Sequence, residues 1–494
     1  MTRLPFIFLL LISSISHARL IHVGAGYAFT SPGQLQDQLM PGDTVYIHTG
    51  VYTGTFFIEN MNGTNAAPIV IKAAEGASVT FRGGTESFHF SDISYVEISG
   101  FTFENQTGNG MNIDDGGSFF TPSHHLKIKN CLFRDIGAGG NNDLLKLSGI
   151  DDFTVEACIF QNGSPGGSGI DMVGCHRGSF IRNQFSNQGS NCIQIKGGSA
   201  DIVITQNKFV NGGARALNIG GSTDLEFFRP QDAPYEASKI RVYANVFEGA
   251  MTPFAFVGAV QCNVFNNTII RPDKWAIRIL QETVDPGRFL PSGMDSVINN
   301  IFIINSNVNT EVNIGPDTDP GSFYFSNNLW FKENQSSWTG PDLPTVDMNQ
   351  IMNNPNVDPI AYKINTLSPA YQKGKPIGNF NDFYNMPFKN PPSIGAVENE
   401  SSLALKQDKK QSKSDSLHKS LVQIYPNPST GILNIESQQA GKYEIIDMKG
   451  QSLNKGVISK GISKLNLSIL SSGNYSIKIK YPYQEVVYKW VKVE

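Results

Sequence analysis

The sequence is poor in charged residues, and the charges that it has are nearly balanced. Asp, Glu, Lys and Arg make up 17% of the 494 residues, and the formal net charge is −4. This balance excludes a protein that binds nucleic acid through bulk positive charge. Hydrophobic residues make up 40% and aromatic residues 11%, which is the composition of a folded chain rather than a disordered one.

Cysteine is also scarce, and its number is odd. With five cysteines, at least one is unpaired within the chain, so a disulfide framework is excluded as the main source of stability. Their spacing does not match a zinc site. The five are Cys131, Cys158, Cys175, Cys192 and Cys262.

Long hydrophobic runs are limited to the N-terminus. Residues 1–18 place Arg3 before an apolar stretch and end in the small residue Ala18. The apolar stretch is about 12 residues, short of the roughly 20 that span a bilayer. This pattern predicts a secretory signal peptide that is cut near Ala18, and we expect no membrane span.

Glycine and asparagine, in contrast, are abundant. The chain has 48 Gly and 44 Asn. Helices disfavour both residues, while tight turns use them. The composition therefore indicates an all-β chain with many turns.

One strand motif recurs through the middle of the chain. An alternating apolar strand leads to Asn or a small residue and then to a second apolar segment, and the copies in closest succession end at Phe133, Phe160, Phe185 and Phe209. Steps of about 25 residues with short strands are typical of a parallel β-helix, in which inward residues stack in columns. We expect a ladder of stacked amides at one corner, formed by Asn130, Asn183, Asn207, Asn245, Asn267, Asn300 and Asn328.

A second strand motif lies between these copies, and each of its members ends near glycine. The members are GMNIDDGG (110–117), LLKLSG (144–149), GIDMVG (169–174), CIQIKGG (192–198) and ALNIGG (216–221). Their alternation gives one outward column, which consists of Asn112, Lys146, Asp171, Gln194 and Asn218. The next outward column consists of Asp114, Ser148, Val173, Lys196 and Gly220.

These columns predict a polar strip of mixed charge on one face of the helix. Asp143, His176, Asn191 and Arg215 stand in the adjoining turns. Amides and charges of both signs suit a polymer of sugar acids, and aromatic residues in nearby loops are candidates to stack on its rings. These aromatic residues are Phe119, Phe120, Phe227, Phe228 and Trp275.

Residues 42–84, together with the repeat, resemble the secreted right-handed parallel β-helix family that includes pectate lyases and the chondroitinase B and alginate lyase group. Uronate lyases remove the proton beside a carboxylate, so they need a base and a cation that neutralises the developing charge. In the chondroitinase B and alginate lyase group a strand carries the catalytic Lys, and IQIKGGS (193–199) resembles that strand. The resemblance implies Lys196 as the base and Arg215 near the place of the family Arg.

The resemblance also implies calcium as a cofactor. The family has a calcium-binding Glu five residues before its Lys, where this chain has Asn191, and Asn ligates calcium through its carbonyl oxygen. We therefore take Asn191 and Asp171 as candidate metal ligands. The candidate catalytic residues are Lys196, Arg215 and Lys146, and the candidate substrate-binding residues are Asp171, His176, Asn218 and Gln194.

The C-terminal segment differs in composition from the repeat. Residues 399–420 are polar and charged without periodicity, which predicts a linker. Residues 421–494 contain short alternating strands that predict a small Ig-like β-sandwich. YPNPSTG, IIDMKGQ and LNLSILSSGNYSIKI within this segment resemble the type A C-terminal sorting domain of the type IX secretion system. The resemblance implies export across an outer membrane and a Bacteroidota-type source.

The expected architecture is therefore an all-β chain with a signal peptide (1–18), a right-handed parallel β-helix (19–398), a linker (399–420) and the sorting domain (421–494). We expect a monomer whose partners are an acidic polysaccharide and the type IX secretion machinery. Two other functions stay open on the same scaffold: a non-catalytic glycan-binding or cell-surface protein, and a glycoside hydrolase. A hydrolase needs two carboxylates, for which Asp143 and Asp171 are the candidate pair.

Overall fold

The computed structural model describes residues 18–137, 142–399, 422–425, 431–437, 440–447, 451–471, 473–480 and 485–492. The expected signal peptide, apart from Ala18, and the expected linker, apart from Asn399, lie outside these residues. Contacts divide the chain into a unit Met1–Asn399 and a unit Glu400–Glu494. The expected domain boundaries stay predictions.

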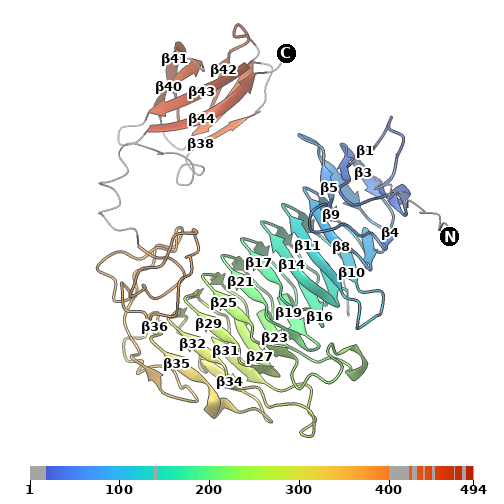
Figure 1. Cartoon of the computed structure of the whole chain (residues 1–494). Coiled ribbons are helices and arrows are strands. Elements are labelled where there is room, and N and C mark those ends of the chain that lie inside the picture. The colour runs from blue at the N-terminus through green and yellow to red at the C-terminus, as the bar shows by residue number, and fades with distance from the viewer. Residues whose placement is uncertain are drawn as a thin grey trace, which may run out of the picture. The chain divides into compact units, whose positions relative to one another are not determined.

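The first unit consists of three long parallel sheets that run side by side along a coil, and most turns of the coil add one strand to each sheet (Figure 1). Sheet A contains β1 (Leu20–Val23), β2 (Thr44–Ile47), β5 (Ile69–Ala73), β8 (Ser94–Ser99), β11 (Ser123–Lys129), β14 (Ile150–Glu156), β17 (Ser179–Ile181), β21 (Val203–Thr205), β25 (Arg241–Tyr243), β29 (Asn263–Phe265), β32 (Ser296–Ile298), β35 (Tyr324–Ser326) and β37 (Asp347–Met348). Sheet B contains β3 (Gly50–Thr53), β6 (Val79–Arg82), β9 (Thr102–Glu104), β12 (Leu132–Arg134), β15 (Ile159–Gln161), β18 (Gln184–Ser186), β22 (Lys208–Val210), β26 (Val246–Glu248), β30 (Thr268–Ile270), β33 (Ile301–Ile304) and β36 (Leu329–Lys332). Sheet C contains β4 (Phe56–Glu59), β7 (Phe88–Ser91), β10 (Met111–Asp114), β13 (Leu145–Ser148), β16 (Ile170–Val173), β19 (Asn191–Lys196), β23 (Arg215–Gly220), β27 (Phe254–Val257), β31 (Ile277–Leu280) and β34 (Val312–Ile314).

Three short strands lie at the corner between sheets C and A. They are β20 (Ser199–Ala200), β24 (Ala237–Ser238) and β28 (Ala259–Val260). The 3-10 helices are η1 (Pro32–Leu35), η2 (Leu225–Phe227) and η3 (Pro320–Ser322). Among the described residues, no helix is long and apolar enough to cross a membrane. The coil confirms the expected all-β parallel β-helix.

The interior of the coil is a column of stacked aromatic rings. Phe133, Phe160, Phe185 and Phe209 lie on successive strands of sheet B, and neighbouring ring centroids are 4.8 to 5.0 Å apart. All four side chains are buried. The spacing follows from the distance of about 4.8 Å between paired strands, so the phenylalanine repeat in the sequence fixes one ring on each turn.

The expected amide ladder lies between sheets A and B. Asn183, Asn207, Asn245, Asn267, Asn300 and Asn328 are fully buried, and each bonds to the next along the coil. The expectation is wrong for Asn130. It lies one residue before the ladder position, in a turn with φ of 52°, and Cys131 takes that position. All five cysteines are free and buried.

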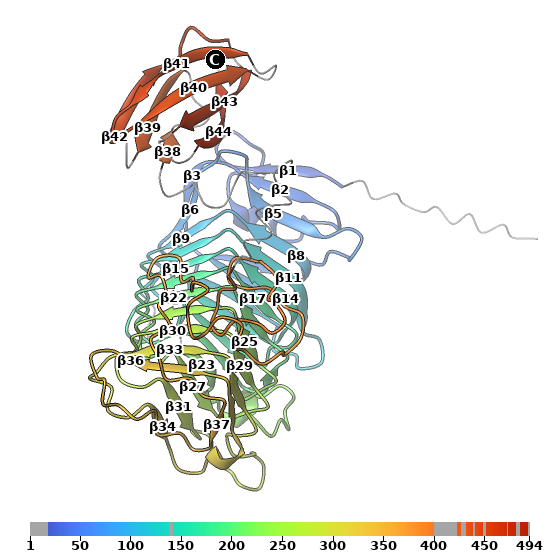
Figure 2. The ribbon, with the colours of Figure 1, turned by 90° about the vertical axis from the view of Figure 1, so that its left-hand side faces the viewer.

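Sheet A ends at β37. The segment that follows β37 turns back over the corner between sheets A and B (Figure 2). Buried side chains in the turns of this corner bind it: Gln206 donates to the carbonyl oxygen of Asp382, and Asn266 donates to that of Ser393. An apolar cluster that includes Leu329, Tyr362 and Ile394 lies beneath this segment. The segment therefore covers the corner that the asparagine ladder lines from inside.

The second unit contains two antiparallel sheets. One consists of β38 (Val422–Tyr425), β39 (Ile432–Ser437) and β42 (Gly461–Asn466), and the other of β41 (Ser452–Ile458), β40 (Gly441–Asp447), β43 (Gly473–Lys480) and β44 (Glu485–Lys492). Leu433 and Ile435 from the first sheet share one buried core with Ile445, Ile477 and Trp490 from the second. The unit is a small β-sandwich, as expected.

Candidate functional site

The outward column of sheet C has the register that the sequence predicts. Neighbouring strands pair Asn112 with Lys146, Lys146 with Asp171, Asp171 with Gln194, and Gln194 with Asn218. The column continues in the other direction to His89, which the second sequence motif did not include. We call these six residues and Lys196 the sheet C strip.

The second outward column deviates from the prediction at one position. Ser148, Val173 and Lys196 are in register as expected, but Gly220 pairs with Ile195 because β23 contains a bulge. A Cβ on Gly220 would lie 1.7 Å from the carbonyl oxygen of Val257, so only glycine fits here.

Two lysines and two carboxylates meet at the centre of the strip. The ammonium of Lys146 contacts the carboxylate of Asp171 directly and lies 3.5 Å from that of Asp143. The ammonium of Lys196 lies 3.6 Å from the same Asp171 oxygen. The carboxylate side chains are buried, while the lysine side chains are 17% and 14% exposed. Asp171 therefore joins two cations that lie on the strands at its two sides, at the outer face of the sheet.

One oxygen of Asp171 has no partner. Its Oδ1 atom is buried and forms no hydrogen bond in the described part of the chain. A buried carboxylate oxygen without a partner is costly.

Burial and neighbouring charges shift the pKa values of Asp143 and Lys146 in the central cluster. Burial, together with the charge of Asp171, raises the pKa of Asp143 to about 7. Burial lowers the pKa of Lys146, but Asp171 and Asp143 raise it more, and the net result is a raised pKa. Lys146 is therefore a permanent cation at neutral pH, whereas Asp143 is close to half protonated.

The raised pKa of Asp143 predicts a pH dependence of stability. Its carboxyl binds a proton in the folded chain up to about pH 7, whereas an unfolded Asp loses it near pH 4. Stability contributed by this proton is complete below about pH 4 and is lost as the pH rises toward 7. We expect the melting temperature of the wild type to fall relative to that of Asp143→Asn as the pH rises through this interval. Parallel melting curves of the two proteins from pH 4 to 8 would contradict the assignment.

Arg215 lies on the strand after Lys196, but it is paired elsewhere. It stands in register with Asn191, and its guanidinium donates to the Asn218 oxygen at 3.0 Å and to Glu282 at 2.7 Å. No direct contact joins Arg215 and Lys196 among the residues that the structure describes. Glu282 follows β31 in a long loop, and no sequence pattern pointed to it.

Asn191 and Gln194 bind each other within β19. The Asn191 amide donates to Gln194 at 3.1 Å and to Ser168 at 3.3 Å. The amide oxygen of Asn191 and the carboxylate of Asp171 remain as the expected calcium ligands. Calcium takes about six to eight oxygen ligands, and two ammonium groups already neutralise Asp171. This donor set does not fit the ion. Among the described residues, no three or more His, Cys, Asp or Glu side chains are grouped so that they could hold a metal.

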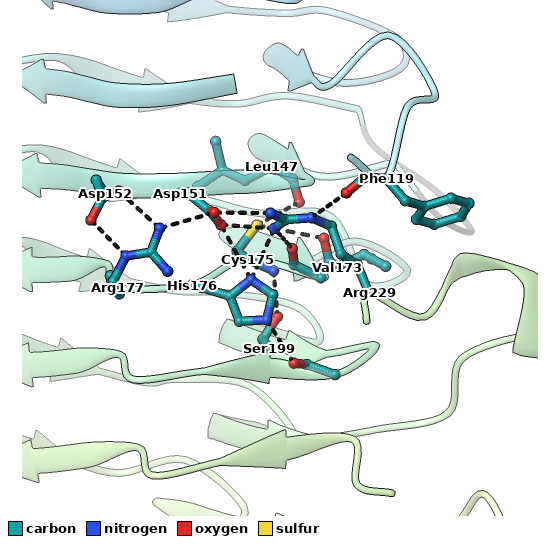
Figure 3. Close-up of polar contacts among 12 residues, drawn as sticks. Phe119, Leu147, Asp151, Asp152, Val173, Cys175, His176, Arg177, Ser199 and Arg229 are labelled. Atoms are coloured by element: carbon teal, nitrogen blue, oxygen red, sulfur yellow. Dashed lines mark hydrogen bonds and ion pairs between the residues drawn. The ribbon is translucent and has the colours of Figure 1, made fainter. Parts of the chain in front are cut away.

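His176 lies at the corner between sheets C and A, away from the outward column (Figure 3). Its Nδ1 atom contacts Asp151 at 3.2 Å and Arg229 at 2.9 Å, and its Nε2 atom contacts the carbonyl oxygen of Gly198 at 3.1 Å. Both ring nitrogens are thus engaged within the protein. Its expected role in substrate binding stays a prediction without support from this geometry.

Arg229 organises this corner. It forms two parallel hydrogen bonds with Asp151, at 2.7 and 2.8 Å, and donates to the carbonyl oxygens of Gly174 and Phe119 (Figure 3). These contacts hold the pKa of Asp151 far below its usual range, although burial alone would raise it. Arg229 therefore ties the loop after β23 to the coil and to the loop after β10.

Glu236 fixes the same loop next to Lys196. The carboxylate is fully buried and accepts hydrogen bonds from the backbone N–H of Gly197, the backbone N–H of Thr223 and the hydroxyl of Thr283. Glu236 thus holds the end of β19, where Lys196 stands. Neither Arg229 nor Glu236 carries a sequence signal, because both come from a loop without repeat.

His89 adds a fixed cation to the strip. Hydrogen bonds to Asp114 and to Glu86 raise the pKa of His89 to about 9, although burial lowers it. The ring is therefore an imidazolium at neutral pH. It lies in register with Phe57, whose ring is 5.1 Å away and 48% exposed. The alternation of FHFS (88–91) could have identified His89 by the same rule that identified Asn112.

The expected aromatic residues divide into two groups. Phe119, Phe120 and Phe227 are exposed, but Phe228 is fully buried against Phe289, so the expectation is wrong for Phe228. The Trp275 ring lies 4.2 Å from the Lys274 ammonium and 4.4 Å from the Arg278 guanidinium. Arg278 belongs to the same outward column, two strands beyond Asn218.

Two family models match the chain. The right-handed β-helix region matches residues 87–335, and the secretion system C-terminal sorting domain matches residues 423–493. The sorting domain shows that the chain is secreted by the type IX system to the outside or to the outer-membrane surface. The Bacteroidota-type source and the signal peptide stay predictions.

Solved structures of similar shape include several that act on or bind glycans. The pectate lyase Pel9A is 14% identical with a TM-score of 0.48, covering 78% of this chain and 98% of the lyase. An alginate lyase from Paenibacillus sp. is 13% identical with a TM-score of 0.40, covering 60% and 95%. The tailspike protein of E. coli bacteriophage HK620, in complex with a pentasaccharide, is 11% identical with a TM-score of 0.43, covering 68% and 60%. These likenesses are too distant to decide an activity. Among curated proteins, none matches the chain.

Proposed function

The chain belongs to the right-handed β-helix family, and from that premise we propose that it is a secreted carbohydrate-active protein that cleaves uronic-acid polysaccharides by β-elimination on sheet C. The observation that carries the proposal is the Lys146–Asp171–Lys196 cluster on the outer face of the sheet. It places a candidate base, Lys196, and a permanent cation, Lys146, on the two strands that flank the strand of Asp171.

The charge of the strip favours an acidic polymer. From Lys146 to Arg278 the side chains of sheet C and its adjoining turns include the cations Lys146, Lys196, Arg215, Lys274 and Arg278. The same strands and turns carry four carboxylates, Asp143, Asp171, Asp273 and Glu282, and the pKa of Asp143 is raised to about 7. A surplus of positive charge remains for uronate groups, while the amides of Gln194 and Asn218 suit sugar hydroxyls.

The proposed mechanism assigns separate roles to the two lysines. Lys196, after its ammonium has released a proton to solvent, takes the proton from the carbon beside the uronate carboxylate. The C–H electron pair forms a carbon–carbon double bond, the glycosidic C–O bond on the next carbon breaks, and the leaving oxygen takes a proton from water. Lys146 neutralises the charge that develops on the carboxylate, and Asp171 stabilises the new ammonium of Lys196. No step uses calcium, and the role of Arg215 is to bind a neighbouring uronate.

The raised pKa of Asp143 favours a second candidate, glycoside hydrolysis. An acid with a pKa of about 7 beside an ionised carboxylate is the arrangement that hydrolases use. Against this alternative, the Asp143 side chain is only 4% exposed, and one of its oxygens accepts the backbone N–H of Ser168. A non-catalytic glycan-binding protein is the third candidate.

The test is an ultraviolet assay for unsaturated uronate ends with the full chain. Pectate, alginate and chondroitin are each incubated with the protein, with added calcium and with a chelator. We expect product from the wild type, and a rate at least about 100-fold lower for Lys196→Ala. Lys127→Ala, an exposed lysine of sheet A, is the matched control and should keep the wild-type rate.

The other outcomes separate the alternatives. New reducing ends without ultraviolet absorbance, lost in Asp143→Asn, would replace the lyase by a hydrolase. Binding without either product would leave a glycan-binding protein. Activity that requires calcium would show that the protein uses the calcium cofactor expected from the sequence. Sedimentation of the same sample tests the expected monomer.

A further inference from the structure

A cavity of 510 Å³ lies at the last turn of the coil, on sheet B rather than on sheet C. Its wall begins at the end of β36 and continues through the loop that follows and through a second loop beyond β37. The lining residues are Trp330, Phe331, Lys332, Asn334, Gln335, Ser336, Trp338, Met352, Asn353 and Asn354. The volume is within the range of about 300 to 1,000 Å³ that is common for small-ligand sites.

The lining combines an aromatic surface with neutral polar groups. Trp338 and Phe331 are half-buried, and four amides and one hydroxyl lie around them. The side chains of Asn334, Gln335 and Asn353 form no hydrogen bond with the described residues. Each amide offers donors as well as an acceptor, so the wall can bind several hydroxyl groups at once.

The one charge on the wall is already neutralised. Lys332 is the only charged residue that lines the described cavity, and its ammonium lies 3.1 Å from Glu311 and donates to the carbonyl oxygen of Val308 at 2.6 Å. It also lies 5.5 Å from the centre of the Trp338 ring. Lys332 therefore holds the tryptophan in place and leaves no free cation for an acidic ligand.

We propose that this cavity binds a neutral oligosaccharide, and that it is a second glycan site, separate in place and in charge from the sheet C strip. The C–H face of a sugar ring packs on Trp338, and its hydroxyls bind the free amides. The site would attach the secreted protein to an uncharged polysaccharide while the strip faces an acidic one. The proposal does not depend on the proposed reaction, because no residue is shared.

The experiment is calorimetric titration of the full chain with cellohexaose, xylohexaose, mannohexaose and laminarihexaose. At least one should bind, and Trp338→Ala should raise its Kd at least tenfold. Because removing Trp338 could disturb the end of the coil, the double variant Gln335→Ala/Asn353→Ala tests the amides alone, and thermal melting checks the fold. Lys196→Ala should bind as the wild type does.

Three results would overturn the proposal. One is the absence of binding for all four probes. Another is a Kd that neither variant changes. The third is binding that is lost in Trp275→Ala but kept in Trp338→Ala, since that would place the neutral sugar on sheet C.

Discussion

Replacing Asn245 by alanine is expected to lower the free energy of unfolding of the β-helix by about 4 kcal/mol. Asn245 is fully buried in the middle of the amide ladder. Its amide donates to the backbone carbonyls of Ile204 and Tyr243, at 2.8 and 2.9 Å, and to Asn267 at 3.0 Å. Its oxygen accepts both the backbone N–H and the side-chain amide of Asn207.

The expected loss is large because the alanine leaves partners behind. At least two carbonyls and one backbone N–H lose their hydrogen bonds in a place that water does not reach. Each such buried group costs about 1 to 3 kcal/mol, and the missing amide adds a small cavity. Because every turn bonds to the next, the defect also interrupts the ladder between Asn207 and Asn267.

The measurement is urea unfolding of the full chain, followed by circular dichroism. Asn263→Ala is the matched control. Asn263 is an exposed asparagine of β29 that bonds to Gln261 and Ser296, and its loss should cost no more than about 0.5 kcal/mol. Equal midpoints for the two variants would show that the ladder contributes little to stability.

The coil could be predicted from the sequence because its determinants are local and repeated. One phenylalanine and one asparagine recur on most turns, and the register then follows from the spacing. The error at Asn130 has a physical cause. The segments KNC (129–131) and RNQ (182–184) both have Asn in the middle. The ladder position, however, is two residues before the stacked phenylalanine, and two residues before Phe133 the chain has Cys131. Asn130 is one residue earlier, where the chain needs a positive φ, which asparagine also tolerates.

The candidate site could be predicted only in part, because only some of its residues belong to the repeated strands. Alternation in β13, β16 and β19 identified Lys146, Asp171 and Lys196, whose side chains the sheet brings together. Arg229, Glu236 and Glu282 come from long insertions without a period, so their contacts across 39 to 78 residues leave no pattern in the sequence. The bulge in β23 likewise depends on close approach to Val257, which only the folded chain reveals.

A second large effect is expected for Asp171→Ala, which should destabilise the β-helix by about 3 kcal/mol. Asp171 is the anion that Lys146 and Lys196 share, and its own side chain is only 3% exposed. Its removal leaves two ammonium groups close together with only Asp143 nearby. Partly buried charges without a counter-ion cost several kcal/mol, because the remaining charge has already lost its water.

The same substitution should also change the titration of its neighbour. The charge of Asp171 is, after burial, the main cause that raises the pKa of Asp143 to about 7. Without it, we expect Asp143 to titrate at a lower pH, and the pH interval in which stability is lost should move downward. Asp171→Asn keeps the shape and removes the charge, so it should reproduce the titration change with a smaller loss of packing.

The control for Asp171 is another ion pair that joins two neighbouring turns. Glu97 and Lys129 lie 2.9 Å apart on sheet A, with side chains 26% and 30% exposed. Because water reaches both groups, Glu97→Gln should cost less than about 1 kcal/mol. Urea unfolding of the three variants at pH 5 and pH 8 gives both readouts. If Asp171→Ala matched Glu97→Gln at both pH values, the lysines of the strip would not depend on Asp171. The anion that stabilises the proposed base would then have to come from the bound glycan itself.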